Sequence, residues 1–325
     1  MARMLSLPPL ALALAAAVTL PSSAFFWNSG KESAQPDPEA PIARNMELTT
    51  YRDVALTGYL DAVDNQGDEL TFQLTDTPAR GSVELAEDGS ARFVYTPYEN
   101  KTGKDTFTYV AVDSQGNTSS PAEVTIHIEK PDTTVFYADL EGRPAHKAAI
   151  RLAEEDILVG RQVGDQYFFD PDAQVSRWEF LTLAMETAGL EPLEQVSLTG
   201  FADDGDIPTW SKGWISSALQ AGVIQGSRDE VGAPIFQADQ AVTQGEAMVM
   251  LDQLLQVSDV PLEVFAPEEQ QSHWASQAAA NLSACGVTTL ETPALGDALT
   301  RGEAAQLLDG ALDVMAQRED GWLFW

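Results

Sequence analysis

Three residues stand at equivalent places in a four-residue pattern that the chain repeats at 176–179, 243–246 and 300–303. Arg177 and Arg301 take the second position in the first and third copies, and Gln244 takes it in the second. A guanidinium group binds a carboxylate or phosphate through two parallel hydrogen bonds. The pattern therefore predicts anion binding at Arg177 and Arg301, whereas Gln244 can hydrogen-bond a sugar but supplies no charge.

An ion pair within the chain is the alternative explanation of both arginines, because the chain has 50 acidic residues against 18 basic ones. The pattern itself marks a helix start, where the macrodipole disfavours a cation. The first amides of a helix also favour an anion. We therefore prefer a binding role for the two arginines, with these amides assisting.

The first and fourth positions of each copy form the capping-box signature, a hydroxyl residue followed three positions later by Glu. In this motif the hydroxyl accepts a hydrogen bond from the amide of the Glu, and the Glu carboxylate accepts one from the amide of the hydroxyl residue. An apolar run with helical spacing follows each copy. Six residues are accordingly interpreted as structural caps: Ser176, Glu179, Thr243, Glu246, Thr300 and Glu303.

A first helix precedes each capped helix, and glycines after it suit a left-handed C-terminal residue. Each unit is thus a helix, a loop and a helix, and we place the three units at 132–192, 193–257 and 258–318. Trp210 and Trp274 belong to first helices, and Trp178 follows Arg177. The indoles of Trp210 and Trp274 are suited to the core or to stacking on sugar rings, and that of Trp178 to lining or shielding a groove beside Arg177. We expect Phe136 and Phe201 in the core, and Asp139 and Asp203 as caps of the first helices.

The order of these segments resembles the S-layer homology domain over about 132–318. The segments that match the family pattern are Trp274-Ala275, the turn 222–226, the loop Phe169-Asp170-Pro171 and the capping patterns. The third copy lacks the loop and the second glycine. The resemblance implies an all-α, pseudo-threefold bundle whose grooves bind cell-wall polysaccharide, often carrying pyruvate ketals. It implies glycan contact by six residues: Arg177, Arg301, Trp178, Gln244, Trp210 and Trp274.

The segment 43–131 alternates apolar and polar residues with period two, as at 70–74, 106–111 and 124–128. Short alternating strands separated by turn residues predict an all-β sandwich. The stretches 62–72, 93–97 and 103–109 resemble bacterial cadherin-like or Ig-like surface repeats. That resemblance implies a spacer or an adhesive module, with other surface proteins as partners.

Four aspartates of this segment are candidates for one metal site: Asp61, Asp64, Asp68 and Asp113. Carboxylate oxygens are ligands that calcium prefers. The same residues are also common turn formers, since their side chains bond to nearby backbone amides. Calcium is the only cofactor that the sequence suggests.

The N-terminal segment 1–24 has Arg3, an apolar run and small residues before a cleavage site, which predicts a secretory signal. We interpret 25–42 as a linker and 319–325 as a tail. After signal cleavage no segment is long and apolar enough to span a bilayer as a helix. The net charge of -32 argues against nucleic acid as a partner.

We find no catalytic motif, so an enzyme is not expected. The sequence predicts a secreted protein of the bacterial cell surface, envelope or periplasm, held non-covalently on cell-wall polysaccharide or peptidoglycan. The alternative is a calcium-dependent adhesion or surface-assembly protein whose helical repeats mediate protein contacts.

Overall fold

The computed structural model describes residues 40–288 and 293–319. The predicted signal 1–24, most of the predicted linker and the tail beyond Glu319 lie outside these residues. Within the described part, no helix combines the length and apolar character needed to cross a membrane.

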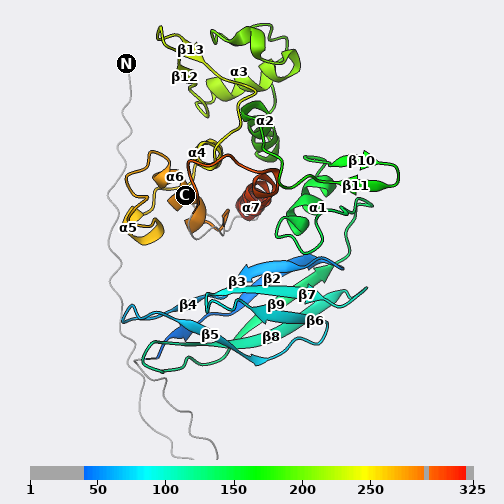
Figure 1. Ribbon diagram of the computed structural model, residues 1–325, viewed down its shortest axis with the longest axis vertical. Coiled ribbons are helices and arrows are strands. Elements are labelled where there is room, and N and C mark those ends of the chain that lie inside the picture. The colour runs from blue at the N-terminus through cyan, green and yellow to red at the C-terminus, as the bar shows by residue number, and fades with distance from the viewer. Residues whose placement is uncertain (1–39, 289–292, 320–325) are drawn as a thin grey trace, which may run out of the picture. The chain divides into compact units, whose positions relative to one another are not determined.

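The N-terminal domain consists of two facing sheets and one short strand pair (Figure 1). One sheet has the order β2 (Met46–Tyr51), β9 (Ala122–Glu129), β8 (Gly103–Val112) and β5 (Thr71–Asp76), with β2 parallel to β9. The other has the order β3 (Leu56–Tyr59), β7 (Arg92–Pro97) and β6 (Gly81–Leu85), while β1 (Ile42–Ala43) pairs with β4 (Ala62–Val63).

The alternation of the strands places one set of side chains between the two sheets. Phe93 and Tyr95 of β7 pack there with Phe107 and Tyr109 of β8 and with Ile126 of β9. Burying these large apolar side chains is the main favourable term in folding of the domain. The predicted β-sandwich is thus observed.

The C-terminal part contains three helix–loop–helix units, as predicted. Their first helices are α1 (His146–Glu154), α3 (Lys212–Gln220) and α6 (Ser276–Ala284), and their second helices are α2 (Arg177–Thr187), α4 (Gln244–Leu255) and α7 (Arg301–Glu319). A short helix, α5 (Leu262–Phe265), precedes α6, and 3-10 turns lie at Asp204–Asp206 and Thr209–Ser211. Two hairpins were not predicted from the sequence: β10 (Arg161–Val163) pairs with β11 (Gln166–Phe168), and β12 (Ser227–Arg228) pairs with β13 (Pro234–Ile235).

A closed cycle of backbone hydrogen bonds joins the three units just before their second helices. Val175 N donates to Leu299 O (3.1 Å), Leu299 N to Val242 O (2.8 Å), and Val242 N to Val175 O (2.9 Å). All three side chains are buried in one continuous core. Each unit therefore supplies its neighbours with partners for buried backbone groups, and no unit completes this set alone.

The glycines near the first helices have two different functions. Gly222 and Gly286 have a φ of +79° directly after α3 and α6, which confirms the left-handed termination. In the first unit Asp156, with a φ of +56°, takes this position. Gly160 instead provides space, because a Cβ there would lie 2.4 Å from Phe168 O.

Two local predictions in the helical units are wrong. Phe136 is 52% exposed, and the neighbouring Tyr137 is buried at the position that matches Phe201. Asp139 and Asp203 do not cap the first helices in the described structure. Each accepts hydrogen bonds from amides of the loop before the second helix, at Phe169 N (2.9 Å) and Phe236 N (2.9 Å) respectively.

Candidate functional site

The residues at the second position of the pattern link each repeat to the next. Arg177 Nη1 lies 2.5 Å from Glu246 Oε1, and Arg301 Nη1 lies 3.1 Å from Glu179 Oε1. Between them, Gln244 Nε2 donates to Glu303 Oε1 at 3.0 Å. The three links run in one direction around the repeats and close a ring. The intrachain ion pair, the alternative considered for the arginines, is therefore present at both.

The amides at the starts of the second helices already have partners, so the expectation that they help to bind an anion is wrong. Arg177 N donates to Gln240 O (2.9 Å) and Trp178 N to Ala238 O (3.2 Å). Arg301 N donates likewise to Ala173 O at 2.8 Å. Carbonyl groups of the neighbouring repeat thus occupy the positions that an anion would need.

The glutamates of the pattern serve two purposes, of which the sequence showed one. Glu246 Oε2 accepts from Thr243 N (3.0 Å) and Glu303 Oε2 from Thr300 N (2.8 Å), which confirms two complete capping boxes. Their other oxygens receive the links from the preceding repeats. In the first repeat Ser176 caps Glu179 N at 3.3 Å, while the Glu179 carboxylate contacts Arg301.

Aromatic rings of the loops hold the two guanidinium groups. The Arg177 guanidinium lies 5.4 Å from the centroid of Phe236, and its Nε donates to Phe236 O at 3.0 Å. The Arg301 guanidinium lies 5.0 Å from the centroid of Phe169. Such contacts favour a cation over the ring face.

A pattern in the sequence corresponds to these ring contacts. Phe169, Phe236 and Pro293 stand at equivalent positions of the three repeats. The two repeats with Phe receive an arginine from their neighbour, and the repeat with Pro293 receives Gln244.

A cavity of about 210 Å³ lies beside Arg177 and is lined by all three repeats. Arg177 comes from the first repeat, Glu246 and Gln237 from the second, and Trp274 from the third. Val223, Ile224 and Met250 form apolar parts of its wall. Trp274 is 64% exposed, so of its two alternatives the core is wrong, and its indole is accessible beside an ion pair. We call this cavity the Arg177 groove.

The corresponding place beside Arg301 differs because a second indole is present. Trp210 matches Trp274 in position and is 59% exposed, so it also lies outside the core. Trp178 packs edge-on against it with ring centroids 4.7 Å apart, and Trp178 Nε1 donates to Asp239 Oδ1 at 3.1 Å. Gly245 and Gly302 occupy the position of Trp178 in the other repeats. The large residue after Arg177 therefore contacts Trp210 and leaves the Arg177 groove open.

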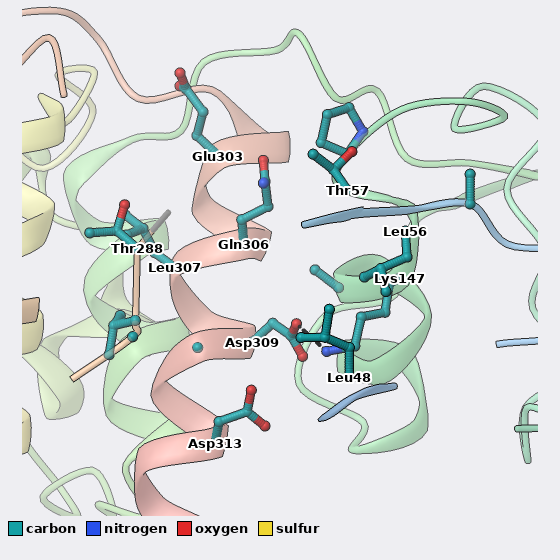
Figure 2. A pocket seen from close by; sticks show the side chains of 16 residues that line it. Leu48, Leu56, Thr57, Lys147, Thr288, Glu303, Gln306, Leu307, Asp309 and Asp313 are labelled. Atoms are coloured by element: carbon teal, nitrogen blue, oxygen red, sulfur yellow. Dashed lines mark hydrogen bonds and ion pairs between the residues drawn. The ribbon is translucent and has the colours of Figure 1, made fainter. Parts of the chain in front are cut away.

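The third place, beside the link from Gln244 to Glu303, has Pro144 at the position of Trp210 and Trp274. A cavity of about 230 Å³ lies there (Figure 2). Besides Glu303 and Lys147, its wall includes Leu48 and Leu56 of the N-terminal domain. This place thus lacks both the guanidinium and the indole of the Arg177 groove.

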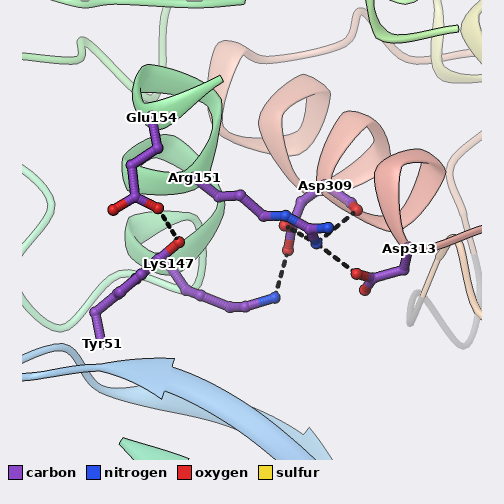
Figure 3. A network of polar contacts seen from close by, with 6 residues as sticks. All are labelled: Tyr51, Lys147, Arg151, Glu154, Asp309 and Asp313. Carbon is purple, nitrogen blue, oxygen red and sulfur yellow. Dashed lines mark hydrogen bonds and ion pairs between the residues drawn. The ribbon is translucent and has the colours of Figure 1, made fainter. Parts of the chain in front are cut away.

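A polar network joins the first and third repeats (Figure 3). Asp309 of α7 lies 2.9 Å from Lys147 Nζ and 3.0 Å from Arg151 Nη1, and Arg151 also pairs with Asp313. Tyr51 donates to Glu154 of α1, and burial followed by this carboxylate raises the pKa of Tyr51 far above its ordinary value. Every charged member of the network has an opposite charge or a hydroxyl beside it, so its evident function is structural.

Three of the four aspartates proposed for calcium lie together. Asp64, Asp68 and Asp113 each place a carboxylate oxygen within 4.8 Å of the others. Asp61 instead pairs with Arg44 at 3.1 Å. Burial raises the pKa of Asp113, but hydrogen bonds from Asn117 and Gln115 outweigh it and hold that pKa below its ordinary value. Carboxylate oxygens gathered in this way are suitable ligands for a hard cation, and calcium remains a prediction.

Residues 38–130 match the family model of the bacterial cadherin-like domain. The match supports the cadherin-like part of the sequence analysis and fits a role at the bacterial surface. It ends before the helical repeats, whose S-layer homology resemblance stays a prediction. No curated protein matches the chain.

Solved structures resemble part of the chain. An endo-fucoidan hydrolase of glycoside hydrolase family 107 is 25% identical over 29% of this chain and 14% of its own, with a TM-score of 0.25. The SrpA adhesin of Streptococcus sanguinis is 20% identical over 31% of this chain and 65% of its own (TM-score 0.22), and the D00-D0 domain of intimin is 16% identical over 29% and 50% (TM-score 0.22). The chain spans only 14% of the hydrolase.

Proposed function

From a bacterial cadherin-like domain joined to three helical repeats, we propose a protein held non-covalently on a cell-envelope glycan. The Arg177 groove is the glycan site, and the cadherin-like domain is a spacer or adhesive module displayed from it. The proposal includes export through the predicted signal 1–24 and a position in the bacterial envelope.

The accessible indole of Trp274 beside the pair Arg177–Glu246 is the observation that carries the proposal. A sugar ring has an apolar face that stacks on an indole and an edge of hydroxyl groups that need polar partners. The guanidinium supplies donors and the Glu246 carboxylate supplies an acceptor. Both are held by contacts within the protein, so little side-chain entropy is lost when a sugar binds.

The other predicted contacts are less favoured. At Arg301, Trp178 already covers part of Trp210. At Gln244 the cavity wall contains neither a guanidinium nor an indole, and residues of the N-terminal domain contribute to it. Glycan binding through Arg301, Trp178, Gln244 and Trp210 therefore stays a prediction, secondary to the Arg177 groove.

Co-sedimentation of the mature protein with purified cell-wall sacculi tests the proposal. Trp274→Ala should weaken binding by about tenfold or more, which corresponds to roughly 1.4 kcal/mol. Val231→Ala is the matched control, because Val231 is an exposed apolar residue of the same helical region outside the groove lining. Equal binding by the Trp274 variant and the wild type would eliminate the groove as the anchor.

Calcium-dependent adhesion by the N-terminal domain is the second candidate, favoured by the three adjacent carboxylates. Here a chelator would release the protein from cells, while Trp274→Ala would leave it attached. The two candidates thus predict opposite results from the same pair of treatments.

A further inference from the structure

We infer that the Arg177 groove recognises an uncharged sugar unit of the envelope glycan and not an acidic substituent. This inference rests on the proposed function, since it specifies the ligand of the same groove. It departs from the anion binding that the sequence pattern predicts for Arg177.

The positive charge in the groove is already matched. The Arg177 side chain is 11% exposed, with Nη1 on the Glu246 carboxylate and Nε on a carbonyl oxygen. A ligand carboxylate would have to displace Glu246, which is also held by the Thr243 amide at 3.0 Å. Displacement would leave the Glu246 charge close to the arriving charge, and like charges at such distances repel strongly.

The remaining polar groups of the groove lining are uncharged. Ser227 Oγ donates to Gln237 Oε1 at 3.2 Å. In the first repeat the matching residues are Arg161 and Asp170, whose charged groups lie 3.4 Å apart. The ion pair of the first repeat is thus replaced by a hydroxyl and an amide in the second repeat, which supplies most of the groove lining.

The backbone donors near the groove and the net charge of the chain also favour a neutral ligand. The amides of Arg177 and Trp178 donate to carbonyl groups of the second repeat, as described above. The net charge of -32 opposes the approach of a polyanion, most strongly at low ionic strength. Apolar surface, an indole and neutral hydrogen-bonding groups remain available, and these suit the hydroxyl and N-acetyl groups of a neutral sugar.

Chemical neutralisation of the ligand tests this inference. Sacculi are compared before and after a carbodiimide couples methylamine to their carboxylates, so that the sugars stay and the carboxylate charges are removed. At roughly 0.5 M salt, where the repulsion between like charges is screened, wild-type protein should bind both preparations within about twofold. Its binding to untreated sacculi should not weaken as the salt concentration rises from roughly 0.05 to 0.5 M. Trp274→Ala should lose binding to both.

The outcomes separate the inference from the proposed function. A loss of about tenfold on amidation, with binding to untreated sacculi weakening steeply in salt and still needing Trp274, would overturn the neutral ligand and keep the glycan anchor. Absence of wild-type binding to either preparation would overturn both.

Discussion

The link between Arg177 and Glu246 allows a quantitative test of the ring that joins the repeats. Glu246→Gln removes the carboxylate that lies 2.5 Å from Arg177 Nη1. The guanidinium, 11% exposed, would keep only the carbonyl of Phe236 and the ring beneath it. A buried cation without its counter-charge is costly, so the variant should be less stable than the wild type.

The size of the effect follows from burial. Removing one partner of a fully buried pair costs roughly 3–5 kcal/mol. The Glu246 side chain is 30% exposed, so solvent reduces the expected loss to roughly 2–3 kcal/mol. The cap itself should survive, because Gln also serves at the fourth position of a capping box.

The chain provides a matched replacement for the arginine. Gln244 donates to Glu303 at 3.0 Å in the equivalent link, so Arg177→Gln can imitate a contact that the protein already uses. This variant removes the buried charge and should cost less than about 1 kcal/mol. In the double variant the two amides can pair, and a coupling energy of about 1–2 kcal/mol is expected.

Urea unfolding followed by tryptophan fluorescence measures these differences. Residues 43–131 contain no Trp, whereas Trp178, Trp210, Trp214 and Trp274 lie in the helical repeats. The midpoint and slope therefore report mainly on the part that holds the ring. A loss below about 0.5 kcal/mol in Glu246→Gln, or equal losses in the two single variants, would refute the reasoning.

Three further predictions concern other parts of the chain. His146 is buried, and burial lowers its pKa from 6.5 to about 4, so the folded state disfavours its protonation. The stability that neutral His146 contributes is present above pH 6.5 and is lost as pH falls toward about 4, by at most about 3 kcal/mol. The unfolding midpoint should therefore fall less steeply with pH for His146→Ser than for the wild type, and an equal pH dependence in both proteins contradicts this role of His146. Asp105→Asn should destabilise the N-terminal domain by roughly 2–4 kcal/mol, because the buried carboxylate accepts hydrogen bonds from Ala79 N, Arg80 N and Tyr95 Oη. Hydrogen exchange of the β8 amides measures this loss, with Glu87→Gln as the exposed control, and similar exchange rates in both variants would count against it. If Asp64, Asp68 and Asp113 bind calcium, a concentration ten times Kd should add about 1.4 kcal/mol to the free energy of unfolding; Asp68→Asn should abolish that gain, and no gain in the wild type would remove the site.

Local patterns determined the secondary structure of much of the chain. A capping box joins residues three positions apart, and an apolar stripe repeats every three or four, so both could be read without a partner segment. The alternation in 43–131 likewise specified which face of each strand is buried, since successive side chains point to opposite sides. The hairpins at 161–168 and 227–235 were not predicted, because their strands are too short to show an alternating pattern.

Tertiary structure decided the functions of the side chains at the helix starts. The sequence placed Arg177 and Arg301 at equivalent positions, but Glu246 is 69 residues from Arg177 and Glu179 is 122 residues from Arg301 along the chain. Closing the ring of repeats brings those carboxylates to the arginines and brings loop carbonyls to the amides beside them. Trp210 has the Trp178 indole packed edge-on against it, whereas Gly245 stands at the position of Trp178 in the second repeat and brings no ring to Trp274. Local sequence patterns thus specified most of the helices and strands and the residues at their ends, whereas long-range packing decided which of those residues neutralise one another and which remain exposed.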